Sequence, residues 1–124
     1  MLSKTSALGV QKISVIIINY NTAEMTEKVI RRLFLCEPGI DFEVILIDNN
    51  SLEKLSIDKF DNLIDKFIEN KENIGFAAAV NQGVSNASND NILLLNSDVL
   101  VEPESISELL ICLNQNEEIM IVGP

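Results

Sequence analysis

Three polar positions, each at the end of an apolar run, are the residues in this sequence that could do chemistry. Asn19 follows I-S-V-I-I-I, Asp48 follows F-E-V-I-L-I, and Asp98 follows I-L-L-L after only Asn96 and Ser97. A carboxylate between apolar segments is costly unless something pairs with it. Asp98 could therefore hold a divalent cation, Mg²⁺ or Mn²⁺, through oxygen. The alternative is a turn aspartate whose side chain accepts hydrogen bonds from nearby backbone N–H groups.

The two carboxylates suit different parts of a nucleotide. An ionised carboxylate only accepts hydrogen bonds, so Asp48 could recognise the imide N–H that uracil and thymine offer. Asp98 would repel a diphosphate unless a metal ion lay between them, and that ion could stabilise the leaving phosphate. Asn19, Asn21 and Asn50 could contact ribose or base, although turn formation is the alternative for each of them.

Strands that alternate with helices would bring these positions together. Apolar runs predict strands at residues 13–18, 42–47, 67–68, 92–95 and 119–122, the last a short fifth strand. Helical periodicity and start or stop signals predict helices at residues 22–35, 56–64, 74–87 and 103–113, with Thr22 and Ser56 as N-caps and Pro103 as a first helical residue. The unbroken run at 92–95 predicts a strand buried on both faces.

This alternation predicts an α/β fold, a three-layer α/β/α arrangement around a mostly parallel, Rossmann-like sheet. With a strand order of 3-2-1-4, the winding reverses between strands 1 and 4. Open sheets bind ligands at such a switch point, outside the carboxyl ends of the strands. Asn19, Asp48 and Asp98 would meet there. The small residues of the helix at 74–87 would let it lie close to the sheet.

Composition limits the possible functions. The 124 residues suggest one domain, which we expect at 12–124 after a disordered leader at 1–11. The formal net charge of −10 disfavours nucleic acid and anionic membrane as partners. The absence of His leaves Asp or Glu as general base. Cys36 and Cys112 lie far apart in apolar surroundings, so we expect two buried free thiols in a reducing, cytoplasmic compartment.

Four segments carry a resemblance to a known family. They are I-S-V-I-I-I-N-Y-N at 13–21, V-I-L-I-D-N-N-S at 44–51, E-N-I-G-F-A-A-A-V-N-Q-G at 72–83 and L-L-L-N-S-D-V-L-V-E-P at 93–103. In this order and spacing they resemble the family 2 glycosyltransferases of GT-A fold, and within them the rhamnosyltransferase-like branch. The likeness extends from Ile13 to Pro124, almost the whole chain.

The resemblance implies a nucleotide-diphosphate-sugar donor of uridine or thymidine type and an acceptor hydroxyl on a saccharide or lipid-linked sugar. It further implies cell-surface polysaccharide synthesis, in the cytoplasm or at the inner face of the membrane. It makes Asp48 the base-recognising carboxylate and Asp98 the metal-binding aspartate of a D-x-D-type motif. The expected substrate-binding positions are Asn19, Tyr20, Asn21, Asp48, Asn50, Asn73, Gly75, Asn81, Asn96 and Ser97.

The sequence departs from the family pattern in three places. Asn96 stands at the first acidic position of the metal motif, so metal binding would depend on Asp98 alone. Residues 52–54 are Leu-Glu-Lys where Thr-Asp-Gly is usual in the family. Ala78 and Ala79 replace a common Gly-Gly, which would tighten the cleft.

No carboxylate in this chain matches the family's general base. We expect that residue and the acceptor site beyond Pro124, which makes the chain the nucleotide-binding half of a glycosyltransferase domain, truncated at its C-terminus. Alone it would bind donor, transfer no sugar, and self-associate through apolar surface left uncovered. The alternative is a noncatalytic nucleotide-binding or interaction module of the same fold. A receiver-type or flavodoxin-like domain is disfavoured because Asn19-Tyr20-Asn21 lacks the paired acidic residues or phosphate loop that those folds place after strand 1.

Overall fold

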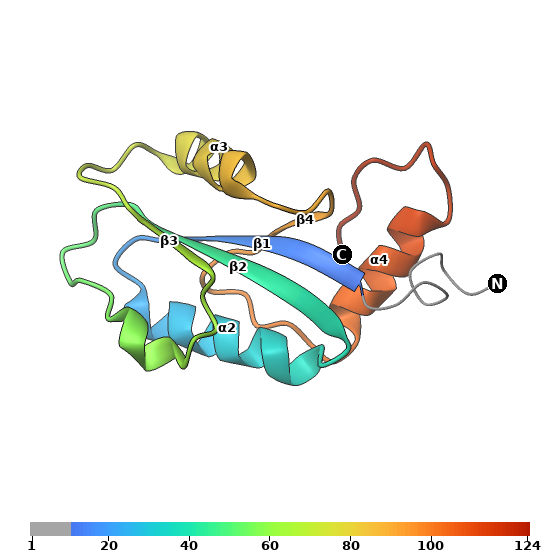
Figure 1. Cartoon of the computed structure of the whole chain (residues 1–124), viewed down its shortest axis with the longest axis horizontal. Helices are drawn as coiled ribbons and strands as arrows, with labels where there is room; N and C mark the ends of the chain where they lie inside the picture. The colour runs from blue at the N-terminus through green and yellow to red at the C-terminus, as the bar shows by residue number, and fades with distance from the viewer. Residues whose placement is uncertain (1–10) are drawn as a thin grey trace.

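A four-stranded parallel sheet forms the centre of the computed structural model, which describes residues 11–124 (Figure 1). Its strands are β1 (Gln11–Asn19), β2 (Ile40–Asp48), β3 (Lys66–Glu69) and β4 (Ile92–Leu94). The strand order is β3-β2-β1-β4, which confirms the order predicted from the sequence. The helical elements are α2 (Ala23–Cys36), the 3-10 helix η1 (Ile57–Phe60), α3 (Phe76–Asn86) and α4 (Ser105–Asn114).

Both faces of β1 are buried, which explains its continuous apolar sequence. Val15 and Ile17 face α2 and α4 in the larger core, whereas Ile16 faces α3 in a smaller one with Ile45 and Ala79. All five of these side chains are fully buried. Helices therefore cover both faces of the sheet, and Figure 1 shows α3 on one side and α2 on the other. The three-layer arrangement is confirmed.

Helix α3 lies close to the sheet because the residues that face it are small. Ala79 is fully buried, and a Cβ added to Gly83 would stand 2.5 Å from Cγ2 of Ile16. No side chain fits at this crossing. The helix begins at Phe76 rather than 74 because Gly75 has a φ of 83°, a conformation that favours glycine.

The N-terminus of α4 is capped by a residue from another helix. Glu37, which follows α2, is 3% exposed, and its Oε1 accepts hydrogen bonds from the backbone N–H groups of Ile106 (2.7 Å) and Ser107 (3.1 Å). The Ser107 hydroxyl donates to Oε2 at 2.5 Å. A carboxylate at this end also complements the helix dipole. Glu104 is left-handed (φ 65°) and provides no side-chain cap, so α4 begins at Ser105 and not at Pro103 as predicted.

Two strand predictions were wrong. β4 is an edge strand because it pairs only with β1, and Ile92 and Leu94 are 40% and 44% exposed rather than buried on both faces. No fifth strand forms after α4 in the described chain. Residues 120–122 instead line an apolar cavity of about 150 Å³ together with Ile92 and Leu93, so they do not pair with the free edge of β4.

Smaller corrections concern the ends of elements. The helix predicted at 56–64 is only the single turn η1, because Asp61 and Asn62 adopt left-handed φ values of 49° and 63°. Gln11, assigned to the leader, is the first residue of β1, and the rest of that predicted leader lies outside the described residues. Cys36 is buried as expected, but Cys112 is exposed because it lies on the outer face of α4. No helix in the described part of the chain has both the length and the apolar character needed to cross a membrane.

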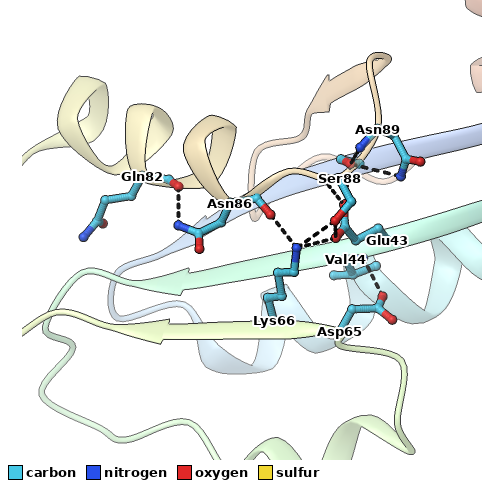
Figure 2. A network of polar contacts seen from close by, with 9 residues as sticks. Glu43, Val44, Asp65, Lys66, Gln82, Asn86, Ser88 and Asn89 are labelled. Atoms are coloured by element: carbon cyan, nitrogen blue, oxygen red, sulfur yellow. Dashed lines mark hydrogen bonds and ion pairs between the residues drawn. The ribbon is translucent and has the colours of Figure 1, made fainter.

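A polar cluster joins the loop after α3 to the opposite end of the sheet from Asn19 (Figure 2). Glu43 of β2 accepts hydrogen bonds from Ser14 (2.5 Å) and from the backbone N–H (2.8 Å) and hydroxyl (2.7 Å) of Ser88, and it pairs with Lys66 at 2.7 Å. Burial alone would raise the pKa of Glu43. The Lys66 ammonium and the hydrogen bonds from Ser14 and Ser88 outweigh burial and lower that pKa from 4.5 to about 2.

The lowered pKa predicts an acid-sensitive contribution to stability. A carboxyl whose pKa is lower in the folded chain stabilises that state above its unfolded pKa and loses this effect as pH falls toward the folded pKa. We expect Glu43→Gln to lower the free energy of unfolding at neutral pH. The gap from wild type should narrow from about pH 4.5 to about pH 2. Urea unfolding at a series of pH values measures it, and a gap independent of pH would contradict the assignment.

Candidate site at the carboxyl edge of the sheet

The carboxyl ends of β1 and β2 place two predicted site residues side by side. Asn19 and Asp48 are register partners in the parallel pair, so their side chains lie on the same face of the sheet, the face covered by α2. The Asn19 Nδ2 group donates to Asp48 Oδ1 at 2.7 Å. Asn19 and Asp48 are 0% and 1% exposed. The predicted meeting of these two positions is confirmed.

Asn19 uses its whole hydrogen-bonding capacity inside the protein. Its Nδ2 also donates to the Ser51 hydroxyl at 3.1 Å. Its Oδ1 accepts from the hydroxyls of Thr22 at 3.0 Å and Thr26 at 2.7 Å. Two donors and two acceptor positions are all that an amide side chain offers. Asn19 therefore joins the ends of β1 and β2 to the first turn of α2, and it has no group free for a ligand.

Asp48 holds the loop that follows β2. Its Oδ1 accepts from the Ser51 hydroxyl (2.6 Å) and its Oδ2 from the Ser51 backbone N–H (3.0 Å). Ser51 in turn accepts from the backbone N–H of Asn21 (2.8 Å), and Asn21 Oδ1 accepts from the Leu52 N–H (2.8 Å). These bonds join the loops after β1 and β2 into one unit. Contact between Asp48 and a base stays a prediction.

The loop after β4 joins this unit through a pair of hydroxyl groups. Ser97 Oγ lies 3.1 Å from Thr22 Oγ1, the same atom that bonds to Asn19. Thr22 stands at the N-cap of α2 as predicted, but its side chain makes no cap bond because its hydroxyl points to Asn19 and Ser97 instead. The predicted switch point between β1 and β4 is therefore bridged by side chains.

A second set of amides attaches the N-terminus of α3. Asn49 is 3% exposed; its Nδ2 donates to Asn73 Oδ1 (2.9 Å) and to the Gly75 carbonyl (3.3 Å), and its Oδ1 accepts from the Ile74 N–H (3.1 Å). Asn73 Oδ1 also accepts from the Gly75 N–H at 2.9 Å. Asn73 and Gly75, two predicted site residues, thus shape the loop that brings α3 to this edge.

Five predicted site residues are exposed, and no hydrogen bond of their side chains to the described residues is observed: Tyr20, Asn50, Asn81, Asn96 and Asp98. Asn50 has a left-handed φ of 66°, which fits its place in the turn after Asp48. Asn81 lies in the middle of α3. These side chains are available to a ligand, in contrast to Asn19, whose donors and acceptors are all used within the protein.

Asp98 is an open carboxylate in a turn. The Val99 N–H donates to the Asn96 carbonyl at 3.3 Å, so residues 96–99 close a turn by backbone alone. The Asp98 side chain accepts no hydrogen bond within the described chain, so the alternative that it caps this turn is wrong. Nowhere in residues 11–124 do three or more Asp, Glu or Cys side chains gather in a way that could hold a metal ion.

Sequence reasoning missed four residues that build this edge: Thr26, Asn49, Ser51 and Gln82. Asn49 and Ser51 stand in the D-N-N-S segment beside Asp48, so the motif itself was the available signal. Thr26 lies one turn into α2 and is fully buried, which helical spacing from Thr22 could have indicated. Gln82 forms a reciprocal amide pair with Asn70 (2.9 and 2.8 Å), a contact without local signal.

Because the Asn19 amide uses all of its donors and acceptors, replacing its nitrogen by oxygen should strongly lower the free energy of unfolding. Asn19→Asp would place a second carboxylate against Asp48, where neither is exposed, so we expect a loss of about 3 kcal/mol or more in the free energy of unfolding at neutral pH. The loss should shrink in acid as one carboxyl becomes protonated. Chemical denaturation measures both effects.

The matched control is Asn21→Asp, the same change two residues later. Asn21 is exposed and its Oδ1 only accepts, which a carboxylate does equally well. This control should stay within about 0.5 kcal/mol of wild type. Similar losses in both variants would show that the position of the amide is unimportant.

The sequence of this chain is similar to those of known glycosyltransferases. The family model described as Glycosyl transferase family 2 matches residues 14–124. A dolichol-phosphate mannosyltransferase from Pyrococcus furiosus is 28% identical in an alignment of 114 residues that covers 89% of this chain and 32% of that protein.

Solved structures share the fold. The S. aureus TarS fragment 1–349 in complex with UDP-GlcNAc superposes with a TM-score of 0.72 at 22% identity, over 85% of this chain and 32% of that one. The mannosyltransferase PcManGT from Pyrobaculum calidifontis, in complex with GDP-Man and Mn²⁺, gives 0.75 at 18% identity, over 87% and 33%. This chain spans about a third of the length of these relatives. Because the family model covers nearly all of the described residues, the chain belongs to glycosyl transferase family 2.

Proposed function

We propose that this chain is the donor-binding part of a glycosyltransferase. It binds a nucleotide-diphosphate-sugar at the carboxyl edge of the sheet, for transfer of the sugar to an acceptor hydroxyl. The observation that carries this proposal is the joining of three loops by buried side chains, which leaves Asp98 open beside them. Loops that are held in place by hydrogen bonds around an unpaired carboxylate are typical of a ligand-binding site. A turn with a purely structural role would not need to leave that carboxylate unpaired.

The relatives support a nucleotide-sugar as ligand. TarS is seen with UDP-GlcNAc and PcManGT with GDP-Man, and both share the fold of this chain. The loop after β2 contains an atom that can accept a further hydrogen bond. This favours uracil or thymine as the base, because both offer an imide N–H. Asp48 Oδ2 accepts one hydrogen bond and has capacity for a second, so Asp48 is the proposed base contact.

The Asp98 carboxylate could supply one of the oxygen ligands of a metal ion. Mg²⁺ and Mn²⁺ accept oxygen ligands, and Mg²⁺ is usually bound through one or two carboxylates together with substrate phosphates. With Asn96 beside it and no acidic cluster in residues 11–124, Asp98 would bind such an ion only when the diphosphate supplies further oxygens. When bound, the ion neutralises charge on the leaving phosphate. PcManGT is seen with Mn²⁺.

Sugar transfer requires more than donor binding. The acceptor oxygen must lose a proton as it attacks the anomeric carbon, so a base has to lie within hydrogen-bond reach. Asp98 is assigned to the metal, and Asp48 is buried and bonded to Asn19 and Ser51, so neither of these two carboxylates is proposed as the base. We therefore place the base and the acceptor site, a saccharide or lipid-linked hydroxyl, in a part of the enzyme that this chain does not contain.

The first test concerns the metal. We expect UDP with Mn²⁺ to stabilise the chain, by about 2.7 kcal/mol at a ligand concentration 100-fold above the dissociation constant, and either component alone to stabilise it much less. Asp98→Asn should remove the contribution of the metal without changing the stability of the free chain. Thermal unfolding with UDP, Mn²⁺, both or neither measures this.

The matched control is Asp90→Asn, which makes the same charge change in the turn before β4, at the other end of the sheet. It should behave as wild type. If Asp98→Asn keeps the full metal-dependent stabilisation, Asp98 is not the metal ligand.

The second test concerns the base. Asp48→Asn should weaken binding of UDP by about 1–3 kcal/mol and binding of ADP by less, because only a base with an imide N–H needs the carboxylate. Ser51→Ala disturbs the same loop but keeps that carboxylate, so it should weaken both nucleotides to the same degree. Calorimetric titration measures both affinities. An equal loss for UDP and ADP in Asp48→Asn would show that Asp48 only shapes the turn.

A further inference from the structure

The hydroxyl of Thr22 lies at the junction of the three loops. It is 3.0 Å from Asn19 Oδ1 and 3.1 Å from Ser97 Oγ. A hydroxyl has one proton and two lone pairs, so it can bond to both neighbours at once. Thr22 occupies the N-cap of α2, yet its side chain makes no capping bond. The usual reason for a threonine at this position is therefore absent.

The turn at 96–98 has few other attachments. The side chains of Asn96 and Asp98 make no hydrogen bond within the described chain, so Ser97 is the residue of this turn whose side chain attaches it to the rest of the edge. On either side the chain is fixed by Leu95, whose N–H donates to Ile16, and by Val101, which is buried. Between these points, the Thr22 contact decides where Asp98 stands.

A continuous chain of hydrogen bonds runs through this contact. Ser51 bonds to Asp48, Asp48 to Asn19, Asn19 to Thr22, and Thr22 to Ser97. Its first members form the proposed base-binding loop, and its last member precedes the proposed metal ligand. Among the side chains of residues 11–124, Thr22 provides the hydrogen bond that connects the two halves.

We infer that Thr22 is a positioning residue that couples base binding at the loop after β2 to metal binding at Asp98. The inference rests on the proposed function and extends it. When the nucleotide occupies the base-binding loop, Thr22 holds the turn at 96–98 in the position where Asp98 meets the diphosphate-bound ion. By linkage, the metal then strengthens nucleotide binding by the same factor as the nucleotide strengthens metal binding.

The test compares two isosteric changes. Thr22→Val removes the hydroxyl that bonds to both Asn19 and Ser97. Thr26→Val removes a hydroxyl that bonds to Asn19 (2.7 Å) and lies 3.4 Å from the Thr22 hydroxyl, but has no contact with Ser97. The ratio of UDP dissociation constants without and with Mn²⁺ measures the coupling. We expect this ratio to fall about 5-fold or more in Thr22→Val and to stay near the wild-type value in Thr26→Val. Equal falls in both variants would overturn the inference, since loss of the Asn19 network alone would explain them.

A double-mutant cycle with Ser97→Ala tests the contact itself. If Thr22 acts through Ser97, the double variant should show no larger fall in the ratio than either single variant. Multiplying effects would show that the two hydroxyls act independently, which also overturns the inference.

Amide hydrogen exchange of the chain without ligand separates this inference from the proposed function. Thr22→Val should speed exchange of the Val99 N–H, which closes the turn onto Asn96, and Thr26→Val should not. If wild type fails to bind UDP with Mn²⁺, the proposed function fails, and the inferred coupling with it. The exchange result then still decides whether Thr22 holds the turn: unchanged exchange in Thr22→Val would show that it does not.

Discussion

The amide of Asn19 bonds to four other side chains: Asp48, Ser51, Thr22 and Thr26. Buried polar groups are costly when unpaired, but a fully satisfied network fixes the geometry of everything that it touches. Here it fixes the carboxyl ends of β1 and β2 and the start of α2. Because the remaining loop, after β4, attaches to the same network through Ser97, the whole candidate site depends on this one amide.

The charge of the chain and of its ligand explains why Asp48 and Asp98 have different surroundings at this edge. A chain with a net charge of −10 would have to limit repulsion at the site in order to bind the proposed anionic donor. Asp48 is surrounded by donors from Asn19 and Ser51, which compensate its charge within the protein. The loops also present the amide of Asn21 and the hydroxyls of Thr22 and Ser97. The Asp98 carboxylate has no such partner, and a cation at this position would turn repulsion of the donor into attraction.

The sequence predicted the fold and the edge where the site lies, because strand burial and the polar residues that end each strand are local signals. Asn19 and Asp48 meet as expected, since parallel strands align their carboxyl ends. Local patterns could not show that the Asn19 amide would be satisfied by Asp48, Ser51, Thr22 and Thr26 rather than face a ligand. They also overestimated strands: the run at 92–95 predicted a strand buried on both faces and the run at 119–122 a short fifth strand, but β4 lies at an edge and residues 120–122 line a cavity. Burial of those segments depends on neighbours that periodicity does not specify.

The cap on α4 has a consequence for the order of folding. Glu37 reaches the N–H groups of Ile106 and Ser107 across 69 and 70 residues of sequence, so α4 receives its cap only after α2 has docked and the chain between them has been ordered. A ten-residue helix is marginal by itself in water. Helix α4 is therefore a late and dependent element: it consolidates on a preformed sheet. In local unfolding it separates before the strands do.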